Sequence, residues 1–200
     1  MTVELVIFDC DGVLVDTERS GNDVLAANLT RHGLSISGDQ THTLFAGGTM
    51  QSVGEEVLKK GIALPENWLD EVYQEIFAKF REGVEVIPGV FDLLDRLGDR
   101  KIAIASNGPM AKMEVTLKPS GLWDRFAGRI YSGHDHGPKP RPDMIKRIMA
   151  DAGVPPEHTL MIDDMPTGCR AAQAAGIRCY GFVIEGDPAR LDGTDAKVVT

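Results

Sequence analysis

Two aspartates near the N-terminus, Asp9 and Asp11, carry the clearest chemical signal in this sequence. They follow an apolar, β-branched run at residues 3–8, which predicts a buried parallel strand that ends where the carboxylates begin. Because side chains alternate between the faces of a strand, Asp9 and Asp11 point to one side and Cys10 to the other. Two neighbouring carboxylates repel each other unless a cation or a proton separates them. The pair therefore predicts a bound metal ion or a protonated acid, and the simpler alternative is a solvated acidic turn.

Three more segments carry side chains suited to phosphate or metal chemistry, namely Ser106 and Asn107 after a second strand, Asp163 and Asp164 after a third, and Lys139 just before a helix. Taken singly, each has an ordinary explanation as a helix cap or a solvated loop charge. In open α/β sheets, however, ligands bind at the carboxyl ends of the strands. The convergence of these residues on one such edge favours a shared site.

The segments between these motifs are of two kinds. Residues 17–82 show helical spacing and few β-branched runs, which predicts an all-helical insert whose first helix is capped by Thr17. On either side of this insert, strands alternate with helices, a pattern typical of a parallel three-layer sheet. We therefore predict an α/β protein, with a Rossmann-like core domain at residues 1–16 and 83–200 and a small helical domain at residues 17–82.

Length, charge and cysteine content restrict the function classes. The 200 residues suffice for a core domain with a smaller insert, and the net charge of -9 argues against nucleic acid or an anionic membrane as partner. No apolar run is long enough to span a bilayer, and the sequence enters a strand without the basic segment of a signal peptide. Cys10, Cys169 and Cys179 lack metal-ligand spacing and fit a reducing compartment. We expect a cytoplasmic protein that is a monomer, or a weak dimer, with a small-molecule partner.

In this order and spacing, the four motifs resemble those of the haloacid dehalogenase superfamily, and the resemblance covers almost the whole chain. It lies with the phosphatase-type members, which carry a helical cap of the C1 type after the first motif. Caps of this size are similar to those of phosphoglycolate phosphatases and of sugar-phosphate phosphatases and mutases. The stretches SNGP at residues 106–109 and YSG at residues 131–133 resemble the 6-phosphogluconate phosphatase group more narrowly.

The resemblance implies a role for each motif residue. Asp9 would attack phosphorus to form an aspartyl-phosphate, and Asp11 would protonate the leaving alcohol and later activate water. Ser106 would hydrogen-bond a phosphoryl oxygen, with Asn107 beside it. Lys139 would neutralise charge on both the nucleophile and the phosphoryl group.

The resemblance also implies Mg2+ as cofactor. Asp164 would hold the ion with Asp9 and the backbone carbonyl of Asp11, and Asp163 would support it directly or through water. Elementary physical chemistry agrees, because a phosphomonoester dianion cannot approach a bare carboxylate until cations are in place. Mg2+ prefers hard oxygen ligands and keeps several waters, which a few carboxylates allow.

The helical insert, as a cap, would select the substrate. From position alone we predict that five of its residues contact the leaving group: Glu18, Arg19, Asn22, Thr49 and Gln51. The expected reaction is hydrolysis of a small phosphomonoester, a sugar phosphate or a sugar-acid phosphate such as 6-phosphogluconate.

Two other functions stay open. A β-phosphoglucomutase-type phosphotransferase shares every core motif. Its cap carries a histidine where this chain has Gly21, and an arginine after the glycine turn at residues 47–48 that is missing here, although Arg19 and Lys59 or Lys60 could partly substitute. The second alternative, a catalytically idle binding protein on the same fold, predicts the loss of motif residues, and all of them are present.

Overall fold

A computed structural model describes residues 2–45, 50–183 and 188–199 of the chain. The chain divides into two compact units: Asp16–Val84 form one, and Met1–Val15 with Glu85–Thr200 form the other. We call the first the helical unit and the second the α/β unit. The chain passes between them at two short paired strands, β2 (Val15–Asp16) and β3 (Glu85–Val86).

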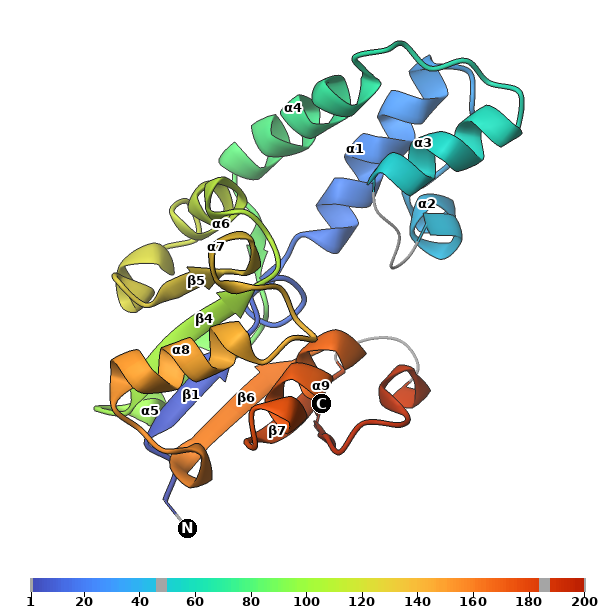
Figure 1. Ribbon diagram of the computed structural model, residues 1–200. Coiled ribbons are helices and arrows are strands. Elements are labelled where there is room, and N and C mark those ends of the chain that lie inside the picture. The colour runs from blue at the N-terminus through green and yellow to red at the C-terminus, as the bar shows by residue number, and fades with distance from the viewer. Residues whose placement is uncertain (1, 46–49, 184–187, 200) are drawn as a thin grey trace. The chain divides into compact units, whose positions relative to one another are not determined.

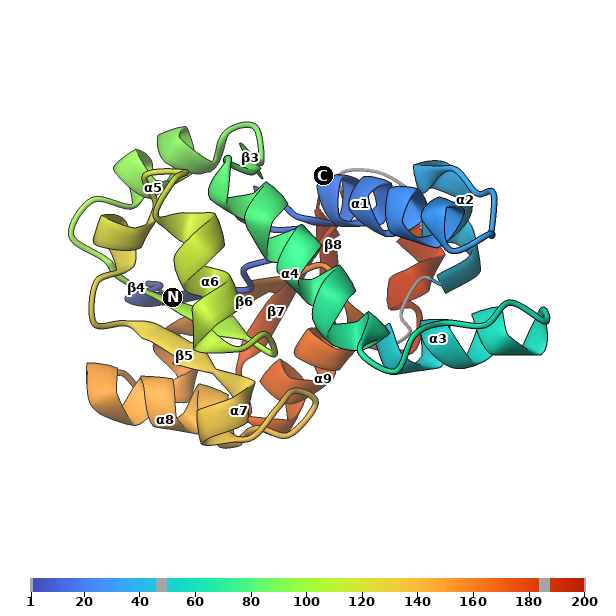
Figure 2. The same ribbon diagram turned by 90° about the horizontal axis from the view of Figure 1, so that it is seen from above.

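The α/β unit contains a six-stranded sheet with the spatial order β5-β4-β1-β6-β7-β8. Figure 1 labels the first five of these strands, and Figure 2 labels β8. The strands are β1 (Leu5–Phe8), β4 (Lys101–Ser106), β5 (Ile130–Ser132), β6 (Thr159–Asp163), β7 (Arg178–Phe182) and β8 (Lys197–Val199). Each neighbouring pair is parallel. The carboxyl ends of β1, β4 and β6 therefore meet at one edge of the sheet.

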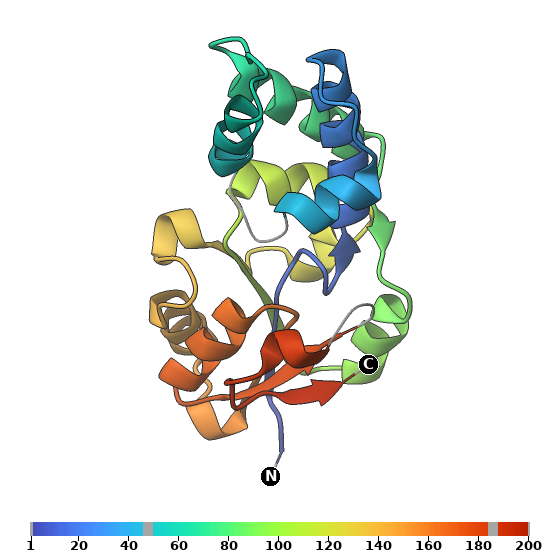
Figure 3. The same cartoon turned by 90° about the vertical axis from the view of Figure 1, so that its right-hand side faces the viewer.

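Helices cover both faces of this sheet. They are α5 (Val90–Leu97), α6 (Met110–Leu117), α7 (Gly133–His136), α8 (Asp143–Ala152) and α9 (Pro166–Ala174), with short 3-10 helices η1 (Trp123–Phe126), η2 (Pro156–His158) and η3 (Pro188–Leu191). Figures 2 and 3 show α8 and α9 on the face opposite to α5, and Figure 2 shows α6 on the same side as α5. The predicted α/β fold with a three-layer parallel sheet is confirmed.

Strand alternation places the core of the α/β unit. Leu5 and Ile7 of β1 are buried with the apolar residues of α8 and α9. Phe8 packs edge-on against Phe126, with ring centroids 5.9 Å apart. Strand β1 is buried throughout and lies between β4 and β6 with parallel pairing, so the buried parallel strand that the sequence predicted is confirmed. No helix in the described part of the chain is long and apolar enough to cross a membrane.

The helical unit consists of α1 (Glu18–Arg31), α2 (Gly38–Phe45), α3 (Met50–Lys59) and α4 (Trp68–Arg81). Helix α1 packs against α2 and α4, and α3 packs against α4. Helix α4 buries a stripe at four-residue spacing, which consists of Trp68, Val72, Ile76 and Phe80. Gly54 of α3 permits this packing, since a Cβ there would lie 2.9 Å from the Trp68 ring.

The prediction that Thr17 caps α1 is wrong. Thr17 precedes the helix with a right-handed helical backbone, and its side chain makes no capping hydrogen bond. The carboxylate of Asp16 instead accepts from the Arg19 backbone N–H at 3.2 Å. A residue that is already helical cannot place its side chain over the first free N–H groups, so the preceding residue takes this role.

Candidate active site

The polar residues predicted from the sequence lie at the carboxyl edge of the sheet. Asp9 follows β1, and its backbone N–H donates to the Ile162 carbonyl of β6 at 2.9 Å. Ser106 ends β4 and Asp163 ends β6. Parallel pairing in register thus brings the ends of three strands to one level.

A pocket of about 180 Å3 lies at this edge, lined by Asp9, Asp11, Ser106, Asn107, Gly108, Lys139, Met165 and Thr167. The sequence analysis did not assign Met165 or Thr167 to the site. The available signal was their position directly after the Asp163-Asp164 pair, at the start of α9. A larger depression of about 560 Å3, beside β7 and the end of α9, contains none of the predicted site residues. We therefore take the smaller pocket as the candidate active site.

Lys139 joins two of the buried carboxylates. Its Nζ lies 2.9 Å from Asp9 Oδ1 and 2.7 Å from Asp163 Oδ2, and its side chain is 3% exposed. Burial alone would lower the pKa of this ammonium group, but the two carboxylates outweigh burial and raise it. Lys139 therefore carries a fixed positive charge at the pocket.

Asp9 remains poorly compensated despite this lysine. Burial raises the pKa of its carboxyl group to about 8, against the lowering effect of Lys139, and the charges of Asp163 and Asp11 add to the rise. Burial is the main cause of this rise, because the carboxylate loses its solvation by water and the lysine does not compensate fully for that loss. A further cation, or a proton, would stabilise it.

Three buried carboxylates could hold that cation. Asp9, Asp163 and Asp164 each offer an oxygen, and these oxygens lie within 4.8 Å of one another. Gly12, with φ of 76°, makes room for this cluster, since a Cβ there would lie 2.6 Å from Asp164 Oδ2. Hard oxygen ligands around surplus negative charge are the donor set that Mg2+ prefers, so the residues fit the ion that the resemblance implies.

Asn107 holds the loop that carries Lys139. Its Oδ1 accepts from the Lys139 backbone N–H at 2.7 Å, and its Nδ2 donates to the Lys139 carbonyl at 3.0 Å. Gly133 packs beneath it, where a Cβ would lie 2.9 Å from Asn107 Oδ1. Both functions of the amide are thus directed to Lys139, and the predicted contact of Asn107 with substrate stays a prediction.

Two hydroxyl groups form hydrogen bonds to the backbone of the loop after β4. Ser106 Oγ accepts from the Gly108 backbone N–H at 3.0 Å, and Ser132 Oγ donates to the Gly108 carbonyl at 2.8 Å. These bonds fix the backbone around the hydroxyl that was predicted to meet a phosphoryl oxygen.

Asp11 has a cation partner that the sequence analysis did not place. Lys112 Nζ lies 2.9 Å from Asp11 Oδ2, and both side chains are about one-quarter exposed, at 25% and 26%. Burial lowers the pKa of Lys112, but its pairing with Asp11 reverses this and leaves the pKa raised. The sequence signal was weak, because a lysine on the first turns of a helix is ordinarily solvated.

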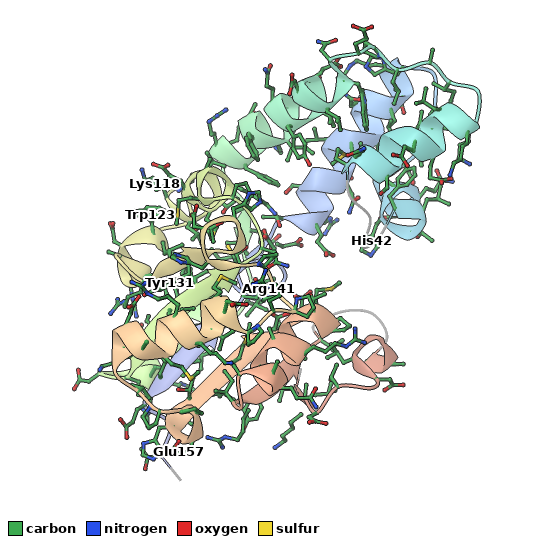
Figure 4. All side chains as sticks on the ribbon, in the orientation of Figure 1. His42, Lys118, Trp123, Tyr131, Arg141 and Glu157 are labelled. Carbon is green, nitrogen blue, oxygen red and sulfur yellow. The ribbon has the colours of Figure 1, made fainter. Side chains whose placement is uncertain are left out.

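The predicted substrate contacts of the insert belong to the helical unit. Glu18, Arg19 and Asn22 lie on α1 and Gln51 on α3, while Thr49 lies outside the described residues. Asn22 Nδ2 is 3.4 Å from His42 Nδ1, and Glu18 Oε2 is 3.9 Å from the same nitrogen. Figure 4 labels His42. The role of these residues toward a substrate stays a prediction.

Comparison with known proteins identifies the family. Residues 6–182 match the haloacid dehalogenase-like hydrolases. The chain belongs to this family. The superfamily that the four motifs predicted is confirmed, and with it a hydrolase of the phosphoric monoester class.

Relatives span nearly the full length of this hydrolase. It is 26% identical to the 6-phosphogluconate phosphatase of Escherichia coli, over 99% of this chain and 90% of that protein. It is 27% identical to the phosphorylated carbohydrates phosphatase of Thermotoga maritima, over 90% of this chain and 86% of that protein. A family hydrolase from Deinococcus radiodurans, solved with bound phosphate and sodium, shares 27% identity with a TM-score of 0.83, over 99% of this chain and 91% of that one.

Proposed function

We propose that this hydrolase is a Mg2+-dependent phosphatase of a small sugar phosphate or sugar-acid phosphate, such as 6-phosphogluconate, and that it acts through an aspartyl-phosphate. The observation that carries the proposal is the position of Lys139, whose Nζ contacts Asp9 and Asp163 within the buried carboxylate cluster. A phosphate dianion needs positive charge of this kind before a carboxylate can attack it. The phosphatase relatives support the substrate class.

The protein residues account for both halves of the reaction. An oxygen of Asp9 forms a bond to phosphorus while the bond from phosphorus to the leaving oxygen breaks, and Asp11 gives that oxygen its proton. In the second half, a water oxygen bonds to phosphorus, the bond to Asp9 breaks, and Asp11 takes a proton from the water. Ser106 and Lys139 bind the phosphoryl oxygens throughout. The products are an alcohol and inorganic phosphate.

Mg2+ would be held by Asp9, Asp164 and the Asp11 carbonyl, with Asp163 in support, and when bound it supplies positive charge to the phosphoryl group. The cluster of three buried carboxylates, two of which share the Lys139 ammonium group, supports a divalent cation over a neutral ligand. We also keep the prediction of a cytoplasmic protein, monomeric or weakly dimeric.

The test is phosphate release from a panel of phosphomonoesters, with Mg2+ and with a chelator. The panel contains 6-phosphogluconate, phosphoglycolate, hexose 6-phosphates and β-glucose 1-phosphate. We expect release from one sugar or sugar-acid phosphate, abolished by the chelator. Conversion of β-glucose 1-phosphate to the 6-phosphate without release would instead establish the mutase. No reaction with any compound would contradict the proposed phosphatase and favour the idle binding protein.

A further inference from the structure

We infer that Lys112 is a positioning residue for Asp11, which holds the Asp11 carboxyl group in the orientation needed for proton transfer to the leaving oxygen. The inference rests on the proposed function, since it assumes that Asp11 is the acid and base of the phosphatase. It assigns a role to a residue outside the four motifs.

The salt bridge itself is the first argument. Lys112 Nζ lies 2.9 Å from Asp11 Oδ2, which is hydrogen-bond distance for an ammonium and a carboxylate. A contact to one named oxygen restricts rotation of the carboxyl group. Asp11 lines the candidate pocket, so this restriction acts on a group that faces the reacting atoms.

The path of the lysine side chain is the second argument. Lys112 lies on the first turns of α6, beyond the loop of Ser106, Asn107 and Gly108. A Cβ on Gly108 would lie 3.5 Å from Lys112 Cδ and 3.3 Å from Ser106 Oγ. The lysine stem, the serine hydroxyl and the Asp11 carboxylate therefore all lie beside Gly108 at the pocket.

The third argument is that the two lysines at the site contact different carboxylates. Lys139 contacts Asp9 and Asp163, while Lys112 contacts Asp11. The two lysines therefore serve different steps, one the phosphoryl group and the other the proton. A role in stability alone is a weak explanation, because partly exposed ion pairs contribute only about 0–1 kcal/mol.

Lys118, directly after α6, provides a matched control. It pairs with Glu114, and its Nζ lies 5.2 Å from the centroid of the Trp123 ring. Its side chain is 51% exposed. Figure 4 labels Lys118 and Trp123. Lys118→Met removes the same charge from the same region without touching the pocket lining.

The experiment compares leaving groups. Proton donation matters greatly when an alkoxide leaves and little when nitrophenolate leaves, because nitrophenolate is stable without a proton. We therefore measure kcat/KM for nitrophenyl phosphate and for the alkyl phosphate that the wild type hydrolyses fastest. For Lys112→Met we expect kcat/KM to fall by roughly 100-fold with the alkyl phosphate and to change little with nitrophenyl phosphate. Lys112→Arg should recover most of the loss, and Lys118→Met should behave as wild type.

A double-mutant cycle makes the test specific to Asp11. In the Asp11→Asn background, Lys112→Met should cause no further loss with the alkyl phosphate, because there is no proton left to position. Equal losses with both leaving groups, or a full further loss in that background, would overturn the inference. Hydrolysis of nitrophenyl phosphate by Lys112→Met also shows that this variant is folded. If Lys112→Met does not fold, Lys112→Gln is measured in its place. If the wild type hydrolyses neither nitrophenyl phosphate nor any alkyl phosphate, the result would instead overturn the proposed phosphatase.

Discussion

The two units of this protein differ in the charge and hydrogen bonding of their buried polar groups. In the helical unit, the fully buried Asn28 accepts from Trp68 Nε1 at 2.7 Å and donates to Glu71 Oε1 at 3.0 Å. These bonds link α1 with α4 through a neutral amide. In the α/β unit, the buried groups at the sheet edge include three carboxylates, and the pKa of Asp9 is raised mainly by its burial, with the charges of Asp163 and Asp11 adding to the rise.

The buried amide of the helical unit stabilises the fold, whereas the buried carboxylates of the α/β unit prepare a site for a reaction. A buried neutral group that makes its hydrogen bonds costs little free energy and holds its neighbours in place. A surplus of buried negative charge lowers stability, but it creates affinity for cations. Substitutions in the two places should therefore change different measured quantities.

The largest effect is expected at Asp9. Asp9→Asn removes the proposed nucleophile, so we expect phosphate release to fall by at least about 10,000-fold. The same change removes a carboxyl group that must take up a proton when it is buried at neutral pH, and we expect the melting temperature without Mg2+ to stay equal or rise. Activity assays and thermal denaturation on one preparation would check both. Residual turnover near that of the wild type would contradict the aspartyl-phosphate mechanism.

Asn107 should show a smaller effect on the rate. Asn107→Ala removes both hydrogen bonds to the Lys139 backbone, so the lysine loses part of its fixed position. We expect kcat to fall by about 100-fold, which corresponds to about 2.7 kcal/mol. If KM rose and kcat did not change, a direct contact of Asn107 with substrate would be the better explanation.

Asn28 should affect stability. Asn28→Ala leaves the buried indole N–H of Trp68 without its acceptor, and we expect the free energy of unfolding to fall by about 2 kcal/mol. Urea denaturation would measure it. Asn22→Ala, on the same helix and more exposed, is the control and should change stability by less than about 0.5 kcal/mol. Similar losses in both variants would show that the buried hydrogen bonds are not the cause.

The smallest effect, counted per pH unit, is a dependence of stability on pH. The pKa of Asp9 is raised from 3.8 to about 8, so between these values the folded chain keeps a proton that the unfolded chain releases. The metal-free protein should therefore lose stability as pH rises through this range, by at most about 1.4 kcal/mol per pH unit. Urea denaturation across pH, in chelator, would measure the slope. Asp9→Asn should remove this contribution, and Mg2+ should reduce it; an unchanged slope in Asp9→Asn would assign it to other groups.

Much of the fold could be predicted because its signals are local. The run before Asp9 and the strands that end at Ser106 and Asp163 each show in the sequence as apolar segments followed by polar residues. Parallel pairing then brings these residues to one edge, as a general property of such sheets. The cap of α1 was misplaced by one residue, because capping depends on the backbone angles of Thr17, which composition does not reveal.

Contacts between loops were harder to predict, because they depend on segments far apart in the sequence. Lys112 and Asp11 are separated by about a hundred residues, and no local pattern pairs them. The same holds for Asn107, whose amide binds the Lys139 backbone 32 residues away. Met165 and Thr167 enter the pocket lining because α9 begins directly after the acidic pair.

The sequence by itself determined which residue types stand at the ends of the strands, and hence the chemistry that this edge of the sheet can perform. It did so because strand periodicity is a property of the backbone and can be detected locally. Only the tertiary structure decided how the charges are distributed there: Lys139 lies against Asp9 and Asp163, Lys112 lies against Asp11, and Asn107 is turned toward the Lys139 loop. The physical reason is that an ion pair forms between the atoms that packing brings within hydrogen-bond distance, and packing is decided by the whole unit.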